Sequence, residues 1–215
     1  MSIVKPAAIL LIICAIVSGI LGYVNDVTTA PIAAADKKTT EESMNAVLAD
    51  AQWGETVEVN YETGDDNGTV ITSYTPGLNP DGSIKGYAVS VTTKGFSAGL
   101  KLMYGIDANS NDDNGTDEGT ITGLSVVDNS NETPGLGANS SKPEWSGQFA
   151  GKKGELEVTK TGSATDSQIN AITGATITSK AVTLSANDVS KYYEDTIKKD
   201  SLFITLLFNS IFIVF

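Results

Sequence analysis

The sequence predicts an α+β fold, in which one N-terminal transmembrane helix precedes a domain of strands bracketed by helices. Two observations predict it. An uncharged apolar stretch lies close to the N-terminus. After it, short alternating segments stand between two segments of helical periodicity, without the regular strand–helix alternation of a parallel α/β fold. The 215 residues are enough for one domain with a core and an appendage.

Residues 1–25 are predicted to form a membrane anchor. Pro6–Val24 carries no charge, and as a helix it would rise about 28 Å, roughly one hydrocarbon core. Lys5 precedes the stretch and Asp26 follows it. The positive-inside rule therefore places the N-terminus in the cytoplasm and the main domain outside, as in a single-pass protein of the cell membrane.

A cleavable signal peptide is the alternative reading of the same stretch. The segment Tyr23–Val27 lacks a small-x-small cleavage site, whereas Ala33–Ala35 comes later and could serve as one. We favour the retained anchor. Cys14 is then an apolar residue of that helix.

Residues 26–54 are predicted to be a linker and a helix. The helix is expected over Thr39–Trp53, because Met44, Val47 and Leu48 recur at helical spacing. It would lead into the main domain.

Residues 55–200 are predicted to form the main α+β domain. Its strongest strand is Gly86–Thr92, where Tyr87, Val89 and Val91 share one face. A closing helix is expected over Thr178–Lys198. The other predicted strands are Val57–Tyr61, Val70–Tyr74, Leu100–Tyr104, Thr120–Val127 and Glu155–Thr159.

Two segments stand apart from this domain. Asp107–Gly119 is acidic, but Asp112 occupies the position at which a calcium loop needs glycine, so an exposed hairpin insertion is favoured. Residues 201–215 form a hydrophobic C-terminal tail, which as a helix would span about 22 Å, short of a bilayer.

Composition excludes several kinds of site. A net charge of −12 argues against nucleic acid as a partner, because phosphate backbones repel an acidic surface. The chain has no histidine and one cysteine, which excludes a histidine-based site, an internal disulfide and a thiolate cluster supplied by this chain alone. Redox chemistry would need an organic cofactor or another protein of the same assembly.

The most informative stretch is Ile172–Lys180, where small residues and hydroxyls precede a helical segment. A helix start presents unpaired N–H groups and a partial positive charge, which suit a phosphate. One of its threonines could hold a phosphate or be esterified by it.

Four segments, in order and spacing, resemble the G subunit of the Rnf complex, the ion-translocating ferredoxin:NAD oxidoreductase. They are Tyr23–Thr28, Lys94–Gly99, Glu132–Gly137 and Thr173–Val182. The C subunit of the sodium-pumping NADH:quinone reductase is similar too. The resemblance runs to about Tyr193 and leaves out the acidic insertion and the tail.

This resemblance implies an FMN-binding domain with covalent FMN, carried through a phosphoester on Thr176. A flavin transferase that uses FAD as donor would install it outside the cytoplasm. Thr173 and Thr178 are expected either beside the flavin phosphate or as helix caps. The remaining expected contacts are Gly174 and Ala175, which keep the approach to Thr176 open, and Glu132, Thr133, Gly135, Leu136 and Gly137 near the ring.

For three more residues the notable alternatives are a role at the flavin and an ordinary structural role. Trp145 and Phe96 are expected to pack in the core rather than to stack on or shield the ring. Lys180 is equally compatible with pairing the phosphate and with solvation. The family usually has an acidic residue where this chain has Asn170, so flavin transfer would be slower if the transferase needs that carboxylate.

By resemblance, the chain is an electron-transfer subunit of the Rnf complex, a translocating oxidoreductase. Its expected partners are the other membrane subunits, the flavin transferase and the lipid bilayer, with no nucleic acid. It has no nicotinamide motif and no cluster ligands of its own. The alternatives are a C-type subunit of a sodium-pumping NADH:quinone reductase, a free-standing extracellular FMN carrier, and a non-redox adhesion module with an unmodified threonine.

Overall fold

The computed structural model describes residues 4–108 and 119–200, which form parts of two compact units, Met1–Glu41 and Glu42–Phe215. Most of the predicted acidic insertion and the whole hydrophobic tail lie outside the described residues, so both remain predictions.

A single long helix, α1 (Val4–Val47), occupies the N-terminal part of the chain. The side chains of its apolar stretch are exposed, with Leu11 and Leu21 each more than half accessible. In the described ranges it is the one helix long and apolar enough to cross a membrane, judged by length and composition. The predicted apolar helix is therefore present. The segment expected to link it to the next helix is itself helical and contains Pro31.

The predicted helix over Thr39–Trp53 is wrong at its C-terminal end. Asp50 has a φ of 55°, in the left-handed region that a short polar residue tolerates, and α1 has ended by then. The next residues form the short strand β1 (Gln52–Trp53), which pairs with Gly77 and Leu78. Backbone pairing with the sheet outweighs the weak helical periodicity of these residues.

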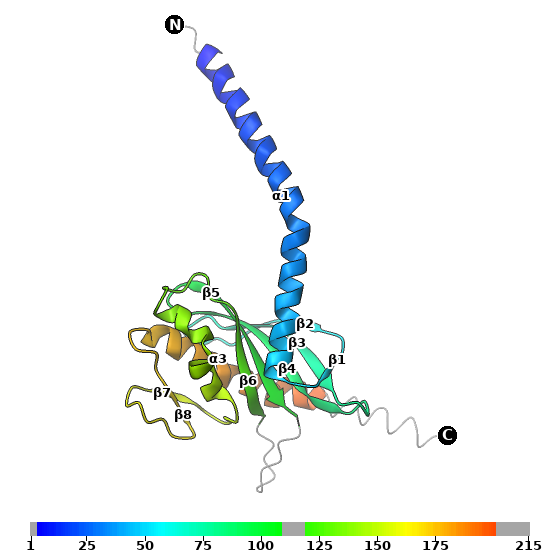
Figure 1. Cartoon of the computed structure of the whole chain (residues 1–215), viewed down its shortest axis with the longest axis vertical. Coiled ribbons are helices and arrows are strands. Elements are labelled where there is room, and N and C mark those ends of the chain that lie inside the picture. The colour runs from blue at the N-terminus through cyan, green and yellow to red at the C-terminus, as the bar shows by residue number, and fades with distance from the viewer. Residues whose placement is uncertain (1–3, 109–118, 201–215) are drawn as a thin grey trace, which may run out of the picture. The chain divides into compact units, whose positions relative to one another are not determined.

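An antiparallel sheet forms the centre of the domain (Figure 1). The strand order is β1-β3-β4-β5-β6, and β2 also pairs with β3, so consecutive long strands are neighbours. The predicted long strands are confirmed, several with extended ends. Their bounds are β2 (Val57–Glu62), β3 (Val70–Leu78), β4 (Ile84–Lys94), β5 (Ala98–Asp107) and β6 (Thr120–Asp128).

Short elements and one long helix complete the domain. The closing helix, α3 (Thr176–Tyr192), starts two residues earlier than predicted and continues into the π-helical turn η3 (Tyr193–Ile197). A two-stranded parallel sheet pairs β7 with β8, a three-residue strand that the sequence did not reveal. The short elements are η1 (Gly137–Ser141), α2 (Pro143–Ser146), η2 (Gly147–Phe149), β7 (Glu157–Thr159) and β8 (Gln168–Asn170).

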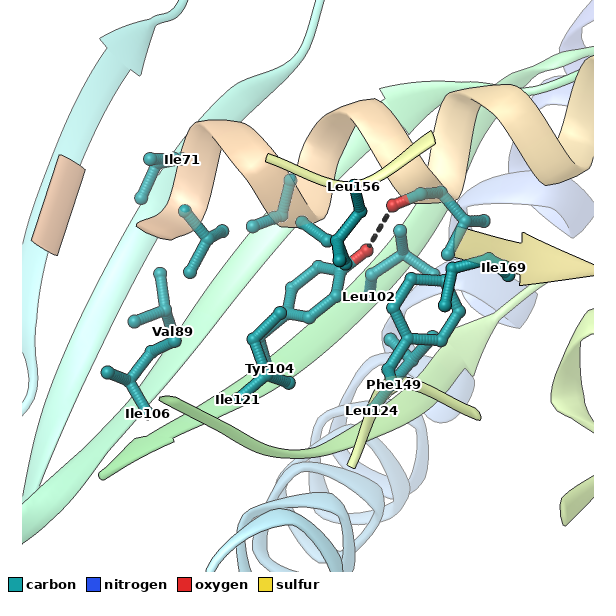
Figure 2. Close-up of a cluster of buried hydrophobic side chains, with 14 of the residues drawn as sticks. Ile71, Val89, Leu102, Tyr104, Ile106, Ile121, Leu124, Phe149, Leu156 and Ile169 are labelled. Carbon is teal, nitrogen blue, oxygen red and sulfur yellow. Dashed lines mark hydrogen bonds between the residues drawn. The ribbon is translucent and has the colours of Figure 1, made fainter. Parts of the chain in front are cut away.

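The main core lies between the sheet and α3. Tyr104 of β5 is fully buried, and its hydroxyl donates to the carbonyl of Val182 at 2.7 Å and lies 2.8 Å from the Ser185 hydroxyl. Figure 2 shows this ring among the buried side chains, next to Phe149, with its hydroxyl directed toward the helix. These bonds satisfy a polar group in an apolar interior and hold α3 to the sheet.

A smaller cluster covers another part of the sheet. The last turns of α1 contribute Met44 and Val47, which pack with Ala88 and Met103. A Cβ at Gly105 would overlap the carbonyl oxygen of Val47, so glycine lets this helix end approach the strand closely.

An acidic pair links α3 to the hairpin between β2 and β3. The Asp188 carboxyl lies near the side chains of Thr63 and Asp65, and one of its oxygens is buried without a hydrogen-bond partner in the described chain. Burial and the nearby charge of Asp65 raise the pKa of Asp188 to about 6, against the opposing effects of the Thr63 hydroxyl and the charge of Lys191. Between about pH 4 and pH 6 the folded chain retains a proton that the unfolded chain releases, so stability falls as the pH rises through this window.

We therefore expect Asp188→Asn to stabilise the protein at pH 7.5 by about 1 kcal/mol, a value reduced for the partial exposure of the group. The gain should shrink toward zero near pH 3.5, where the aspartate is largely protonated in both states. Urea unfolding at the two pH values measures it. Asp81 is a control of opposite sign, because bonds from Ser83 lower its pKa, and Asp81→Asn should give no gain at pH 7.5.

Candidate functional site

The loop before α3 is closed by a buried serine. The Ser179 hydroxyl accepts a hydrogen bond from the Ile172 N–H and donates one to the Ala175 carbonyl, both at 2.9 Å. Gly174 has a φ of 79°, a left-handed conformation that favours glycine. The loop therefore turns sharply and delivers Thr176 to the first position of the helix.

The first turn of α3 carries unpaired donors. The first hydrogen bond of the helix runs from the Ser179 N–H to the Ala175 carbonyl at 3.0 Å. Within the described ranges, the N–H groups of Thr176, Ile177 and Thr178 have no backbone acceptor. In the same part of the chain, the half-buried Thr176 hydroxyl makes no hydrogen bond. Together these donors suit an anionic group such as a phosphate.

A pocket of about 470 Å³ opens at this helix start. Three segments far apart in the sequence line it: the turn between β4 and β5, the loop after β6, and the first turn of α3 with the residues before it. This volume is typical of small-molecule sites. The lining residues are Phe96, Thr133, Leu136, Gly137, Gly174, Ala175, Thr176, Ile177 and Thr178.

Three exposed apolar side chains surround the pocket. Phe96 is 63% exposed, Ile177 57% and Leu136 40%. Large apolar groups gathered at one opening are typical of a surface that meets an apolar ligand or partner. With threonine hydroxyls and N–H groups between them, they offer contacts for a molecule with a flat apolar part and an anionic part.

The expectation that Phe96 packs in the core is wrong. Phe96 lies in the tight turn between β4 and β5, beyond the last residues that these strands pair. The turn projects past the core, so this side chain faces the pocket opening instead. Ile177 was not predicted as a site residue. It falls outside the buried face of Val182, Ala186 and Val189, which is the signal that could have identified it.

Glu132 lies behind the pocket wall rather than in the lining. It is 4% exposed, and both of its carboxylate oxygens are engaged. One oxygen accepts from the N–H groups of Phe96 at 3.0 Å and Ser97 at 3.4 Å, and the other accepts from the Thr178 hydroxyl at 2.6 Å. The carboxylate thus joins the three segments that line the pocket.

Two glycines make room for this carboxylate. A Cβ at Gly95 or at Gly137 would overlap an oxygen of Glu132, and one at Gly137 would also meet the Thr178 hydroxyl oxygen at 2.7 Å. Gly137 therefore leaves the space that the buried Glu132 carboxylate occupies.

Three other predicted residues lie outside the lining. Thr173 and Lys180 are exposed. Gly135 has a φ of 76° and shapes the turn in which the Leu136 N–H bonds the Thr133 carbonyl at 3.1 Å. The contribution of Gly135 is therefore to the shape of the loop.

The expected core position of Trp145 is confirmed. Its ring packs edge-on against Phe149 at 5.4 Å, and its indole N–H donates to the Asn170 carbonyl at 2.7 Å. Asn170 also receives a bond on its carbonyl from Gln148 at 3.5 Å and donates its N–H to the Gln148 side chain at 2.9 Å. These bonds hold β8, the strand that precedes the loop before α3, against α2 and η2.

Comparison with known proteins identifies the family to which this chain belongs. Residues 95–191 match the FMN-binding domain, and this range contains every residue of the pocket lining. The chain is 32% identical over 181 residues to the G subunit of the ion-translocating oxidoreductase complex of Methanosarcina acetivorans, covering 84% of this chain and 88% of that protein. This chain belongs to the family of G subunits of these complexes.

Two further G subunits are similar. That of the Na⁺-translocating ferredoxin:NAD⁺ oxidoreductase complex of Acetobacterium woodii is 34% identical over 90% of this chain and 93% of its own. That of the proton-translocating ferredoxin:NAD⁺ oxidoreductase complex of Clostridium ljungdahlii is 44% identical over 45% of this chain and 47% of its own. Membership in the family rests on the first two relatives, whose matches cover 84% and 90% of this chain.

Solved structures are similar at a lower level. NqrC of Shewanella oneidensis has 17% identity and a TM-score of 0.45, covering 67% of this chain and 66% of that one. The C subunit of the Na⁺-translocating NADH-quinone reductase from Parabacteroides distasonis has 28% identity and a TM-score of 0.43, covering 65% and 75%.

We expect Gly137→Ala in this G subunit to destabilise the domain by about 1–3 kcal/mol, because the new Cβ forces the Glu132 carboxylate away from its donors. Thermal unfolding measures the loss. Gly147→Ala is the matched control: Gly147 has a helical φ of −63° and open space around its Cβ position, so its stability should be unchanged or slightly raised. Equal effects of the two substitutions would contradict the packing described for Gly137.

Proposed function

We propose that this chain is the FMN-carrying electron-transfer subunit of a membrane-bound, ion-translocating ferredoxin:NAD oxidoreductase complex, and that FMN is esterified to Thr176. The observation that carries the proposal is the free Thr176 hydroxyl, which stands at the start of α3 inside the pocket of an FMN-binding domain. Family membership supports the complex, and the pocket supports the position of the cofactor.

The chemistry of attachment suits this position. The Thr176 oxygen would attack the FMN phosphorus of FAD, the pyrophosphate bond would break, AMP would leave, and the hydroxyl proton would pass to solvent or to a base of the transferase. The N–H groups of Ile177 and Thr178 stand free to bind the phosphate oxygens. Gly174 has no side chain, and Ala175 has a small one, so the threonine stays open to the enzyme.

Bound FMN supplies reversible electron transfer, and the residues of the chain hold it in place. Phe96, Leu136 and Ile177 offer apolar contact to a flavin ring and displace water from it. A phosphoester would retain the cofactor on a domain that faces a large outer volume, where a dissociated flavin would be lost.

The proposed partner subunits are inferred from the family and from the absence of a nicotinamide motif in this sequence. The relatives are named as subunits of complexes, so we infer that other membrane subunits surround this one. Ferredoxin and NAD would bind to those subunits, because this sequence carries no nicotinamide motif. The complexes of the named relatives translocate Na⁺ in one case and protons in another, and the proposal for this chain is a translocated cation.

We infer that the N-terminus of α1 lies in the cytoplasm and that the domain after it lies outside. Lys5 before the apolar stretch and Asp26 after it support this orientation. The lipid bilayer would then cover the exposed apolar side chains of α1. Polar residues flank this apolar stretch on both sides.

Thr176→Ala should abolish covalent flavin. When the chain is coexpressed with a flavin transferase, intact mass spectrometry of the wild type should show the added mass of an FMN phosphoester, and the denatured band should fluoresce under ultraviolet light. Both signals should disappear in the alanine variant and persist in Thr173→Ala, whose exposed hydroxyl lies outside the pocket lining.

Other results of that experiment have definite meanings. Flavin that persists in Thr176→Ala would place the ester on another residue, with Thr178 the first to test. A wild-type chain without added mass, despite an active transferase, would overturn covalent attachment. Copurification of several polytopic subunits with the flavinylated chain would distinguish the complex from a free-standing carrier.

Orientation has its own test. Lys160→Cys in a Cys14→Ser background places a thiol at an exposed position of the domain. A membrane-impermeant maleimide should label it on intact cells. Ser2→Cys in the same background is the control, and it should be labelled only after permeabilisation. The reverse pattern would contradict the proposed orientation.

A further inference from the structure

The Glu132 side chain hydrogen-bonds both of the other pocket-lining segments from its place in the third. It belongs to the loop after β6, accepts hydrogen bonds from the turn at Phe96 and Ser97, and accepts another from Thr178 of α3. Two backbone N–H groups donate to one of its carboxylate oxygens, and the Thr178 hydroxyl donates to the other.

This carboxylate is balanced by hydrogen bonds and not by a cation. Glu132 is 4% exposed, and within the described ranges no lysine forms an ion pair with it. Two N–H groups, one hydroxyl and the positive end of the α3 dipole stabilise its charge instead. The protein interior has a lower effective dielectric constant than water, so the electric field of a buried carboxylate is weakly screened there.

The carboxylate lies directly behind the pocket wall. Thr178 and Gly137 both line the pocket, and both contact Glu132: the first through a 2.6 Å hydrogen bond, the second so closely that a Cβ there would overlap the carboxylate. One layer of residues therefore separates this charge from the space in which the flavin is proposed to lie.

We propose that Glu132 is a positioning residue that sets the electrostatics of the flavin pocket: its buried carboxylate fixes the three walls of the pocket and lowers the reduction potential of the flavin that they hold. This inference rests on the proposed function. A fixed negative charge close to the cavity opposes the addition of electrons to the ring, whereas its neutral isostere does not.

The test compares two substitutions that separate charge from shape. Glu132→Gln keeps the size of the side chain and an acceptor for the Phe96 and Ser97 N–H groups but removes the charge. Glu132→Asp keeps the charge and shortens the reach. Glu144→Gln, at an exposed position of α2, is the matched control for loss of one negative charge. Each full-length chain is coexpressed with the flavin transferase and purified in detergent.

Two quantities are measured on each chain: the fraction that carries FMN, by intact mass, and the midpoint potential of the bound flavin, by redox titration followed by absorbance. We expect a more positive potential in Glu132→Gln, a wild-type potential in Glu144→Gln, and a potential near wild type in Glu132→Asp, even though its shorter side chain lowers stability or FMN loading. A merely structural role would shift the Gln and Asp variants alike.

Each outcome either supports or overturns the proposed role of Glu132. A flavinylated Glu132→Gln chain with the wild-type potential overturns the inference, as does an equal shift in both Glu132 variants. If the Gln variant does not load FMN, Glu132→Asp carries the test, and a positive shift in it overturns the inference. A wild-type chain without FMN refutes the proposed function before any potential is measured, so the two failures are distinguishable.

Discussion

The packing of α3 against the sheet fixes the position on which the pocket depends. Val182, Ala186 and Val189 are fully buried on one side of this helix, and the Tyr104 hydroxyl binds its backbone at Val182. The apolar contacts supply most of the stabilisation, and the hydrogen bond fixes where along the sheet the helix lies. Thr176 is less than two turns away from Val182, so its place follows from this contact.

A helix start alone would leave the other walls of the pocket free to move. Glu132 prevents this by hydrogen-bonding the turn at Phe96 and the first turn of α3. Burying an acid is costly unless it is fully hydrogen-bonded. Here Gly95 and Gly137, which have no side chains, leave space for the carboxylate to lie within hydrogen-bonding distance of its donors. The pocket walls are thus joined by one polar group at the start of α3.

Local patterns identified much of this arrangement from the sequence. Alternating residues predicted the strands, and the small and hydroxyl residues before α3 predicted the helix start, because both depend on neighbours in the chain. The short strands β1 and β8 depend on pairing with distant segments and were missed. Phe96 was misplaced for a similar reason: only the projection of its turn shows that an aromatic residue there faces solvent. The role of Glu132 also required three distant segments to be seen together.

The end of α1 belongs to the folded domain as much as to the helix that precedes it. Met44 and Val47 are buried against the sheet, Ser43 receives a hydrogen bond from Ser125 at 3.1 Å, and the Val47 carbonyl is bound by Thr122. Proteolysis between the apolar stretch and Ser43 would release a fragment that keeps this cover. Cleavage beyond Val47 would uncover apolar sheet surface, and the released fragment would tend to aggregate.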